Sequence, residues 1–199
     1  MTALLRTIQL IEQELRDAYG FSHDLRAVDH LLEPTSAEQL GYGSLRGGLL
    51  VSQSADDELL IGIHIHPSIV ASLEVMDPST KLTTANLHAF AVVAEEVSHF
   101  LHVVDRATRS RPISYLELET QGEIDKLLAA GRVLMAQCGQ PHLLPLARVL
   151  YDQARIDAED SLQERYWEAT RRAATYWYDL LQKQSEWTLV RATPTLLAG

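Results

Sequence analysis

The stretch AVVAEEVSHFLHVV, residues 91–104, places Glu95, Glu96, His99 and His102 close together without a Lys or Arg among them. Successive residues of a helix are about 100° apart, so Glu95, His99 and His102 would lie along one stripe, with Glu96 beside it. The apolar residues of the stretch would lie on the opposite side. Carboxylates and imidazoles are metal ligands, whereas a solvated helix face usually mixes acids with Lys and Arg. The stretch therefore indicates either a metal site or the solvated face of a core helix.

The spacing within this stretch suits one metal ion. Glu95 and His99 are four residues apart, so both can reach the same ion from one helix face. Glu96 would stand beside that ion as a general base for water that the ion activates. The arrangement is that of an H-E-x-x-H helix in which Glu95 replaces the first histidine.

A further ligand has to come from another element. The segment ISYLELETQGEIDKLLAAGRVL, residues 113–134, carries Glu119 and Glu123 one turn apart near the edge of an apolar helix face. A carboxylate at the edge of the core needs a partner, because burying an unpaired charge is costly. That partner would be either a metal ion shared with the preceding helix or a cation such as Lys126.

The remaining elements are predicted from the periodicity of the apolar residues. Two apolar runs within residues 48–67 are separated by polar residues and predict a β-hairpin, with His64 and His66 on the same face of its second strand, residues 58–67. Helices are expected over residues 3–18, 67–75, 84–104, 113–136 and, as one or two long helices, 143–184. The sequence thus predicts one α+β domain, residues 1–199, dominated by helices, with a small antiparallel sheet and a C-terminal helical extension.

The order of a hairpin strand, the EEVSHFLH helix, a loop and the EIDKLLAA helix resembles the gluzincin branch of zinc peptidases. It is most similar to the small ImmA/IrrE-type metallopeptidases, and the resemblance covers residues 58–135. It implies a zincin-like core that binds a metal through Glu95, His99 and Glu123, with Glu119 as the rival third ligand and Glu96 as the base. The strand containing His64 and His66 would line the cleft and pair with an extended peptide substrate. Glu95 stands where that family has His, and its extra negative charge favours harder ions such as Mn or Fe over Zn.

Two other functions are open at this point. One is a zincin-fold protein without catalytic activity that acts through protein–protein interaction. The other is a ferritin-like di-metal carboxylate protein, in which two helices each carry Glu-x-x-His. Glu96 and His99 fit one copy of that motif, but no other histidine of the chain has Glu three positions before it.

The composition narrows the partners. A formal net charge of −10 and a pI near 5.2 disfavour binding to nucleic acid or to an anionic membrane. The single cysteine, Cys138, rules out an intramolecular disulfide and any zinc site with two thiolates. The N-terminus lacks the pattern of a signal peptide, and a cytoplasmic location is expected. The C-terminal helices could also form a homodimer.

Overall fold

The computed structural model describes residues 1–21, 23–53, 59–152 and 160–191, with side chains of the last range from residue 163. The helices are α1 (Ala3–Tyr19), α2 (Pro34–Gln39), α3 (Pro67–Val75), α4 (Leu87–Thr108), α5 (Tyr115–Cys138), α6 (Leu143–Ala147), α7 (Asp160–Lys183) and α8 (Glu186–Arg191). The strands are β1 (Gly47–Gln53) and β2 (Leu59–Ile65). A 3₁₀ turn covers Ala27–His30, and a π-helical turn covers Arg148–Asp152. The predicted α+β class, with mostly helices and one small antiparallel sheet, is confirmed.

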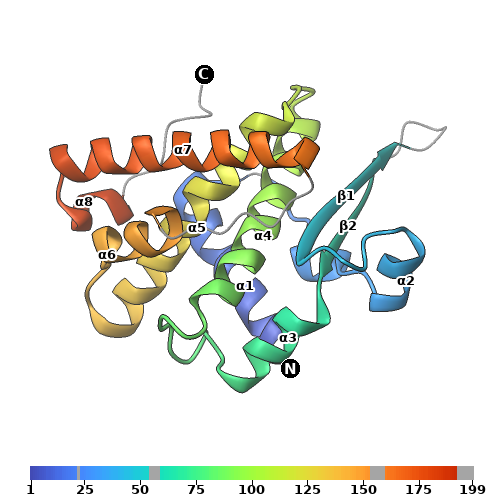
Figure 1. Cartoon of the computed structure of the whole chain (residues 1–199), viewed down its shortest axis with the longest axis horizontal. Helices are drawn as coiled ribbons and strands as arrows, with labels where there is room; N and C mark the ends of the chain where they lie inside the picture. Colours follow the sequence, from blue (N-terminus) through green and yellow to red (C-terminus); the bar gives the residue numbers. More distant parts are fainter. Residues whose placement is uncertain (22, 54–58, 153–159, 192–199) are drawn as a thin grey trace.

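Helix α4 runs through the middle of the protein, with α1, α3, α5 and the hairpin packed around it (Figure 1). It is the one helix in the described part of the chain that is long and apolar enough to cross a membrane, and 83% of that apolar window is buried inside the protein. The core helix of a globular domain gives the same pattern. The buried apolar side chains of α1, β2, α3 to α6, α7 and α8 join in a single cluster around it.

Local sequence signals account for the ends of the main helices. Helix α1 ends at Gly20, which adopts φ 65° and donates its N–H to the carbonyl of Arg16. Helix α5 begins with a capping box, in which Ser114 and Glu117 each bond the other's backbone N–H. These two signals fix where the helix that carries Glu119 starts and where the N-terminal helix stops.

The hairpin lies against α4 with one face. Gly47 pairs with Ile65 and Leu49 with Ile63, so these residues share the face that packs toward the core, where Ile63 and Ile65 are buried. Residues 31 and 32 cover the far edge of β2, because Leu32 N–H donates to Ile63 O at 2.8 Å. Strand β1 is therefore the outer strand of the hairpin.

Helix α7 crosses over α5 at one side of the molecule (Figure 1). Trp177 is 1% exposed and donates its indole N–H to Ile124 O on α5 at 3.2 Å, so it is a packing residue. The C-terminal extension predicted over 143–184 contains two separate helices, α6 and α7, with a π-helical turn after α6. Residues 153–159 of that prediction lie outside the described residues.

Candidate metal centre

Glu95 and His99 on α4 meet Glu119 on α5. One ligand atom from each residue can be chosen so that all three atoms lie within 4.8 Å of one another. Ligand atoms around a four-coordinate ion with bonds of roughly 2.1 Å lie about 3.4 Å apart. A contraction of little more than about 1 Å would therefore bring these three side chains onto one ion. In the part of the chain that the structure describes, this is the one group of three such side chains.

The atoms that face one another across this group have no hydrogen-bond partner. His99 Nε2 lies 3.7 Å from Glu119 Oε2, and both atoms are buried and unpaired among the described residues. His99 and Glu119 are each 6% exposed. Buried polar atoms in proteins are almost always hydrogen-bonded, and an unpaired one costs about 1–3 kcal/mol. A cation between these two atoms would satisfy both, so the donor set fits a metal ion.

Gly122 makes this approach of the two helices geometrically feasible. A Cβ atom at Gly122 would lie 2.7 Å from His99 Nε2 and 3.3 Å from Glu95 Cγ. The imidazole therefore occupies the space that any other residue would fill at this point of α5. Glycine inside a helix costs about 0.5–1 kcal/mol relative to alanine, and here its absent side chain leaves room for the candidate ligands.

Glu96 lies on the other side of the imidazole. Its Oε2 is 3.6 Å from His99 Nδ1 and is buried without a hydrogen-bond partner among the described residues. The backbone of β1 covers this carboxylate, because a Cβ at Gly47 would lie 2.8 Å from Glu96 Oε1. Glu96 thus adjoins the three-residue group from the Nδ1 side, as carboxylates beside metal-bound histidines do.

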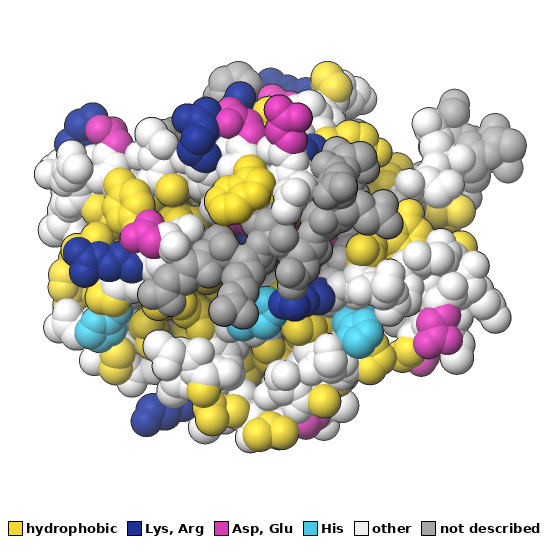
Figure 2. All heavy atoms as spheres, viewed as in Figure 1, with side chains coloured by type: hydrophobic (Ala, Val, Ile, Leu, Met, Phe, Trp, Pro, Cys, Tyr) yellow, Lys and Arg dark blue, Asp and Glu magenta, His cyan; other side chains and the backbone are white. Residues whose placement is uncertain are grey.

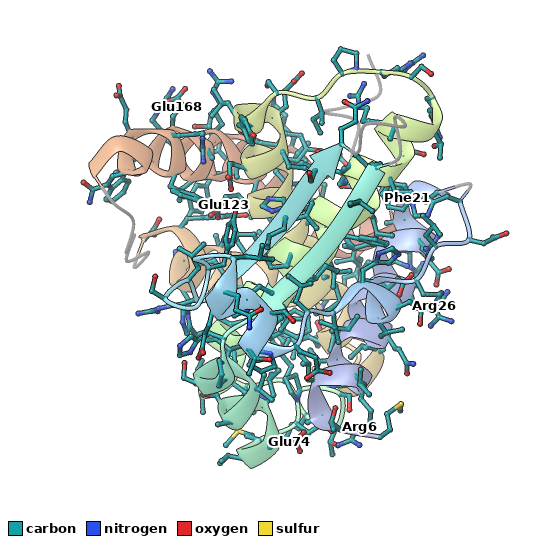
Figure 3. The ribbon with its side chains drawn as sticks, turned by 90° about the vertical axis from the view of Figure 1, so that its right-hand side faces the viewer. Arg6, Phe21, Arg26, Glu74, Glu123 and Glu168 are labelled. Carbon is teal, nitrogen blue, oxygen red and sulfur yellow. The ribbon has the colours of Figure 1, made fainter. Side chains whose placement is uncertain are left out.

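Glu123 lies outside the three-residue group because a lysine holds it. Lys126 Nζ is 2.7 Å from Glu123 Oε1 and 3.0 Å from Glu95 Oε2. Figure 3 shows Glu123 on α5 near α7, behind the hairpin. Of the two carboxylates considered for the third ligand, the structure brings Glu119 rather than Glu123 to His99.

A second cation approaches from α7. Arg165 Nη2 is 3.6 Å from Glu119 Oε1, and the guanidinium lies over the rings of Tyr115 and Tyr166. Glu119 thus has one oxygen near Arg165 and the other near His99. Sequence alone does not connect Arg165 with this site, because Arg165 is 46 positions from Glu119 and its helix carries no metal-ligand motif.

The pKa values show how strongly these groups interact. Burial alone would lower the pKa of His99, but the carboxylates of Glu96, Glu119 and Glu95 raise it to about 9. Burial raises the pKa of Glu119 to about 7, although His99 opposes that change. Burial also raises the pKa of Glu96, whereas Lys126 outweighs burial at Glu95 and lowers its pKa. Without a metal, His99 therefore holds a proton at neutral pH and partly balances the surrounding carboxylates.

His102, which shares the predicted stripe, belongs to a different network. Its Nε2 lies 3.0 Å from Asp125 Oδ2, which also accepts a hydrogen bond from Ser98 at 2.6 Å. Asp125 Oδ1 accepts from Gln121 at 2.8 Å and from Tyr19. Asp125 is 0% exposed, and within the described residues its carboxylate bonds to side chains of α1, α4 and α5. This network fixes the three helices relative to one another, one turn away from the candidate ligands.

The two histidines predicted on the substrate-binding strand lie elsewhere. His64 is 1% exposed, and its ring contacts Leu45 O at 3.1 Å on the face of the sheet opposite α4. His66 caps α3 by accepting the Ser68 N–H at 3.1 Å. That these two histidines line a substrate cleft stays a prediction. On the other strand of the hairpin, Gly47 lies next to Glu96.

No protein-family model matches this chain, and neither a curated protein nor a solved structure shows significant similarity to it. The resemblance to the gluzincin peptidases therefore depends on the order and spacing of the motifs alone.

Proposed function

We propose that this protein binds one divalent metal ion through Glu95, His99 and Glu119 and uses it in peptidase-like hydrolysis. The observation that carries the proposal is the pair of unsatisfied atoms, His99 Nε2 and Glu119 Oε2, which face each other at 3.7 Å in a buried site. Two carboxylates and one imidazole suit Zn²⁺, Mn²⁺ and Fe²⁺ alike. A single group of this kind in the described residues favours one ion over a di-metal centre.

The neighbouring residues would divide the remaining tasks. When bound, the ion supplies Lewis-acid activation of a carbonyl and of water. Glu96 would be the general base, as the motif implies. Its Oε2 has no hydrogen-bond partner among the described residues but lies beside Nδ1 of His99, so the side chain would have to turn past the imidazole to reach water on an ion at Nε2. Burial raises the pKa of Glu96, which makes the carboxylate a stronger base than an exposed glutamate.

An extended peptide could approach along β1. The Arg46 carbonyl accepts a hydrogen bond from His66 N–H, so the alternation of an antiparallel ladder turns the peptide groups of Gly47, Leu49 and Val51 away from β2. Among the described residues no strand pairs with this edge. Strand addition there would bring the peptide next to Gly47 and so next to Glu96. We therefore place the substrate strand on β1 rather than on β2.

Metal analysis of protein purified without a His-tag tests the centre. We expect about one Zn²⁺, Mn²⁺ or Fe²⁺ per chain, lost in His99→Ala and retained in a matched control, His142→Ala, which removes an exposed histidine at the N-cap of α6. Protein that takes up no metal, and whose melting temperature is the same with and without a chelator, would refute the proposal.

Hydrolysis is tested separately with Glu96→Gln. A general base predicts loss of peptide hydrolysis with metal affinity kept. If Glu96 instead serves to orient His99, metal affinity falls by roughly 10–100-fold.

The second candidate is a zincin-fold protein that acts through binding alone. Lys126 and Arg165 already contact the candidate ligands, so the carboxylates have cationic partners before any metal arrives. This candidate predicts a stable metal-free protein that still recognises an extended peptide along β1. Peptide binding by a parent protein that takes up no metal would favour it over the hydrolase.

A further inference from the structure

Lys126 is a buried cation in direct contact with a candidate metal ligand. Its side chain is 12% exposed, and its Nζ bridges Glu123 on its own helix and Glu95 on α4. Lysine is almost never buried without a partner. Glu123, one turn before Lys126 on α5, would be enough to pair with it, so the second contact, to a residue 31 positions away, needs its own explanation.

Glu95 provides that explanation through its charge. In an H-E-x-x-H helix the first ligand is a neutral imidazole, whereas Glu95 brings one negative charge to the same place. The positive charge of Lys126 offsets this negative charge, because Lys126 Nζ lies 3.0 Å from Glu95 Oε2. The contact occupies one oxygen of the carboxylate and leaves the other for an ion. Glu95 and Lys126 together therefore present an oxygen ligand without net charge.

Glu123 holds Lys126 in place for its contact with Glu95. Its 2.7 Å contact holds the ammonium group on the side of α5 that faces α4, and Tyr151 donates a hydrogen bond to the Glu123 carbonyl at 2.9 Å. The residue that resembled a third ligand thus supports the lysine.

Building on the proposed metal centre, we propose that Lys126 is a positioning residue that neutralises Glu95 and makes the centre select Zn²⁺ over Mn²⁺. Without the ammonium, Glu95 becomes a fully charged oxygen donor, and such donors favour harder ions. The selectivity of the site then depends on a residue that does not itself touch the ion.

The test compares the dissociation constants of Zn²⁺ and Mn²⁺, measured by calorimetry on the chelator-treated full-length chain. Lys126→Met is expected to lower the preference for Zn²⁺ by about tenfold or more, the scale of effect known for residues behind metal ligands. Lys126→Arg keeps the positive charge and is expected to preserve the preference. Lys183→Met is the matched control, because Lys183 pairs with Asp179 on the surface of α7.

A double variant separates the contact with Glu95 from the total charge of the group. Glu123→Gln with Lys126→Met removes one negative and one positive charge, so the local formal charge equals that of the parent, but Glu95 still lacks its ammonium. The preference for Zn²⁺ should therefore stay as low as in Lys126→Met. An unchanged preference in Lys126→Met, or a double variant that recovers the preference of the parent, would overturn the inference. If Lys126→Met does not fold, Glu123→Gln alone serves as the test. It leaves Lys126 to Glu95 and should raise the preference for Zn²⁺, and no rise would count against the inference.

Failure of the inference and failure of the metal centre give different results. A parent protein that binds neither ion refutes the metal centre itself. A parent that binds both ions with a ratio that is insensitive to Lys126 leaves the centre intact and refutes only the role of the lysine.

Discussion

The ring of His99 fills the space that a side chain at position 122 would need, because a Cβ on Gly122 would lie 2.7 Å from His99 Nε2. Two helices can therefore meet at this point only if one of them carries glycine. This contact between α4 and α5 lies beside the candidate ligands, and Glu119 on α5 depends on it for its distance to the imidazole on α4.

Gly122→Ala should for this reason weaken Zn²⁺ binding by about tenfold or more, since ligand geometry has to be kept within about 0.5 Å. In an ordinary helix the same change stabilises by roughly 0.5–1 kcal/mol. Gly131→Ala is the matched control, because its Cβ would meet Leu143 Cδ2, away from the candidate ligands. Calorimetry and urea unfolding of both variants should show lost affinity only in the first. Equal affinity in the two would contradict the geometry.

Glu119 and Glu123, one turn apart on α5, provide a matched pair of variants. Glu119→Gln removes the oxygen that faces His99 Nε2 and should reduce metal affinity by about 100-fold or more, as expected for a direct ligand. Glu123→Gln leaves that oxygen in place and should change the affinity by less than about tenfold. Calorimetric titration with Zn²⁺ measures both, and the reverse order of effects would assign the third ligand to Glu123.

The pH dependence of metal binding follows from the pKa values of the metal-free site. His99, with a pKa of about 9, and Glu119, with a pKa of about 7, must both lose their protons to bind a cation. Metal affinity should therefore rise with pH, by about two protons per ion below pH 7 and about one between pH 7 and 9. Titration in two buffers with different ionisation enthalpies counts the released protons. An affinity that does not change between pH 6 and 8 would show that these groups are not the ligands.

Asp125 should govern stability rather than metal affinity. Its carboxylate is 0% exposed and accepts hydrogen bonds from α1, α4 and α5. Asp125→Asn replaces one acceptor oxygen with a donor and should lower the free energy of unfolding by roughly 2–4 kcal/mol. Asp152→Asn, an exposed aspartate bonded to Tyr178, should cost less than about 1 kcal/mol. Urea unfolding measures both, and similar losses would argue against a special role for the buried network.

The sequence alone was enough to predict those features whose geometry depends on a single helix or a single hairpin. A helix puts Glu95 and His99 on one face whatever surrounds it, and the change from helical to alternating periodicity located the hairpin. The sequence could not decide whether Glu119 or Glu123 is the third candidate ligand, because residues one turn apart share a helix face. Only the packing of α5 on α4 determines which of the two reaches His99. Lys126 decides which glutamate faces His99, because it pairs with Glu123. From the sequence, Lys126 could be named only as an alternative to a metal ion as the partner of a buried carboxylate.

The same limit applies to the strand beside the site. Alternation correctly put His64 on the face opposite Ile63 and Ile65, but it cannot say which strand of a hairpin is the outer one. That depends on Leu32, which bonds to the edge of β2 from a segment earlier in the chain. The contact of Gly47 with Glu96 could not be predicted either, because glycine is common next to a turn and its presence there does not indicate a nearby site.

The Asp125 network also has a kinetic consequence. The contact from Tyr19 to Asp125 spans 106 residues, whereas the ligand helices α4 and α5 are consecutive in the chain and His99 and Glu119 are close in sequence. Contacts between distant residues form late because they carry a larger loop-closure entropy. The α4–α5 pair can thus assemble its ligands before the N-terminal helix docks, and a metal ion present during folding would reach the half-formed protein. Metal capture would then be an early folding event that precedes the docking of α1.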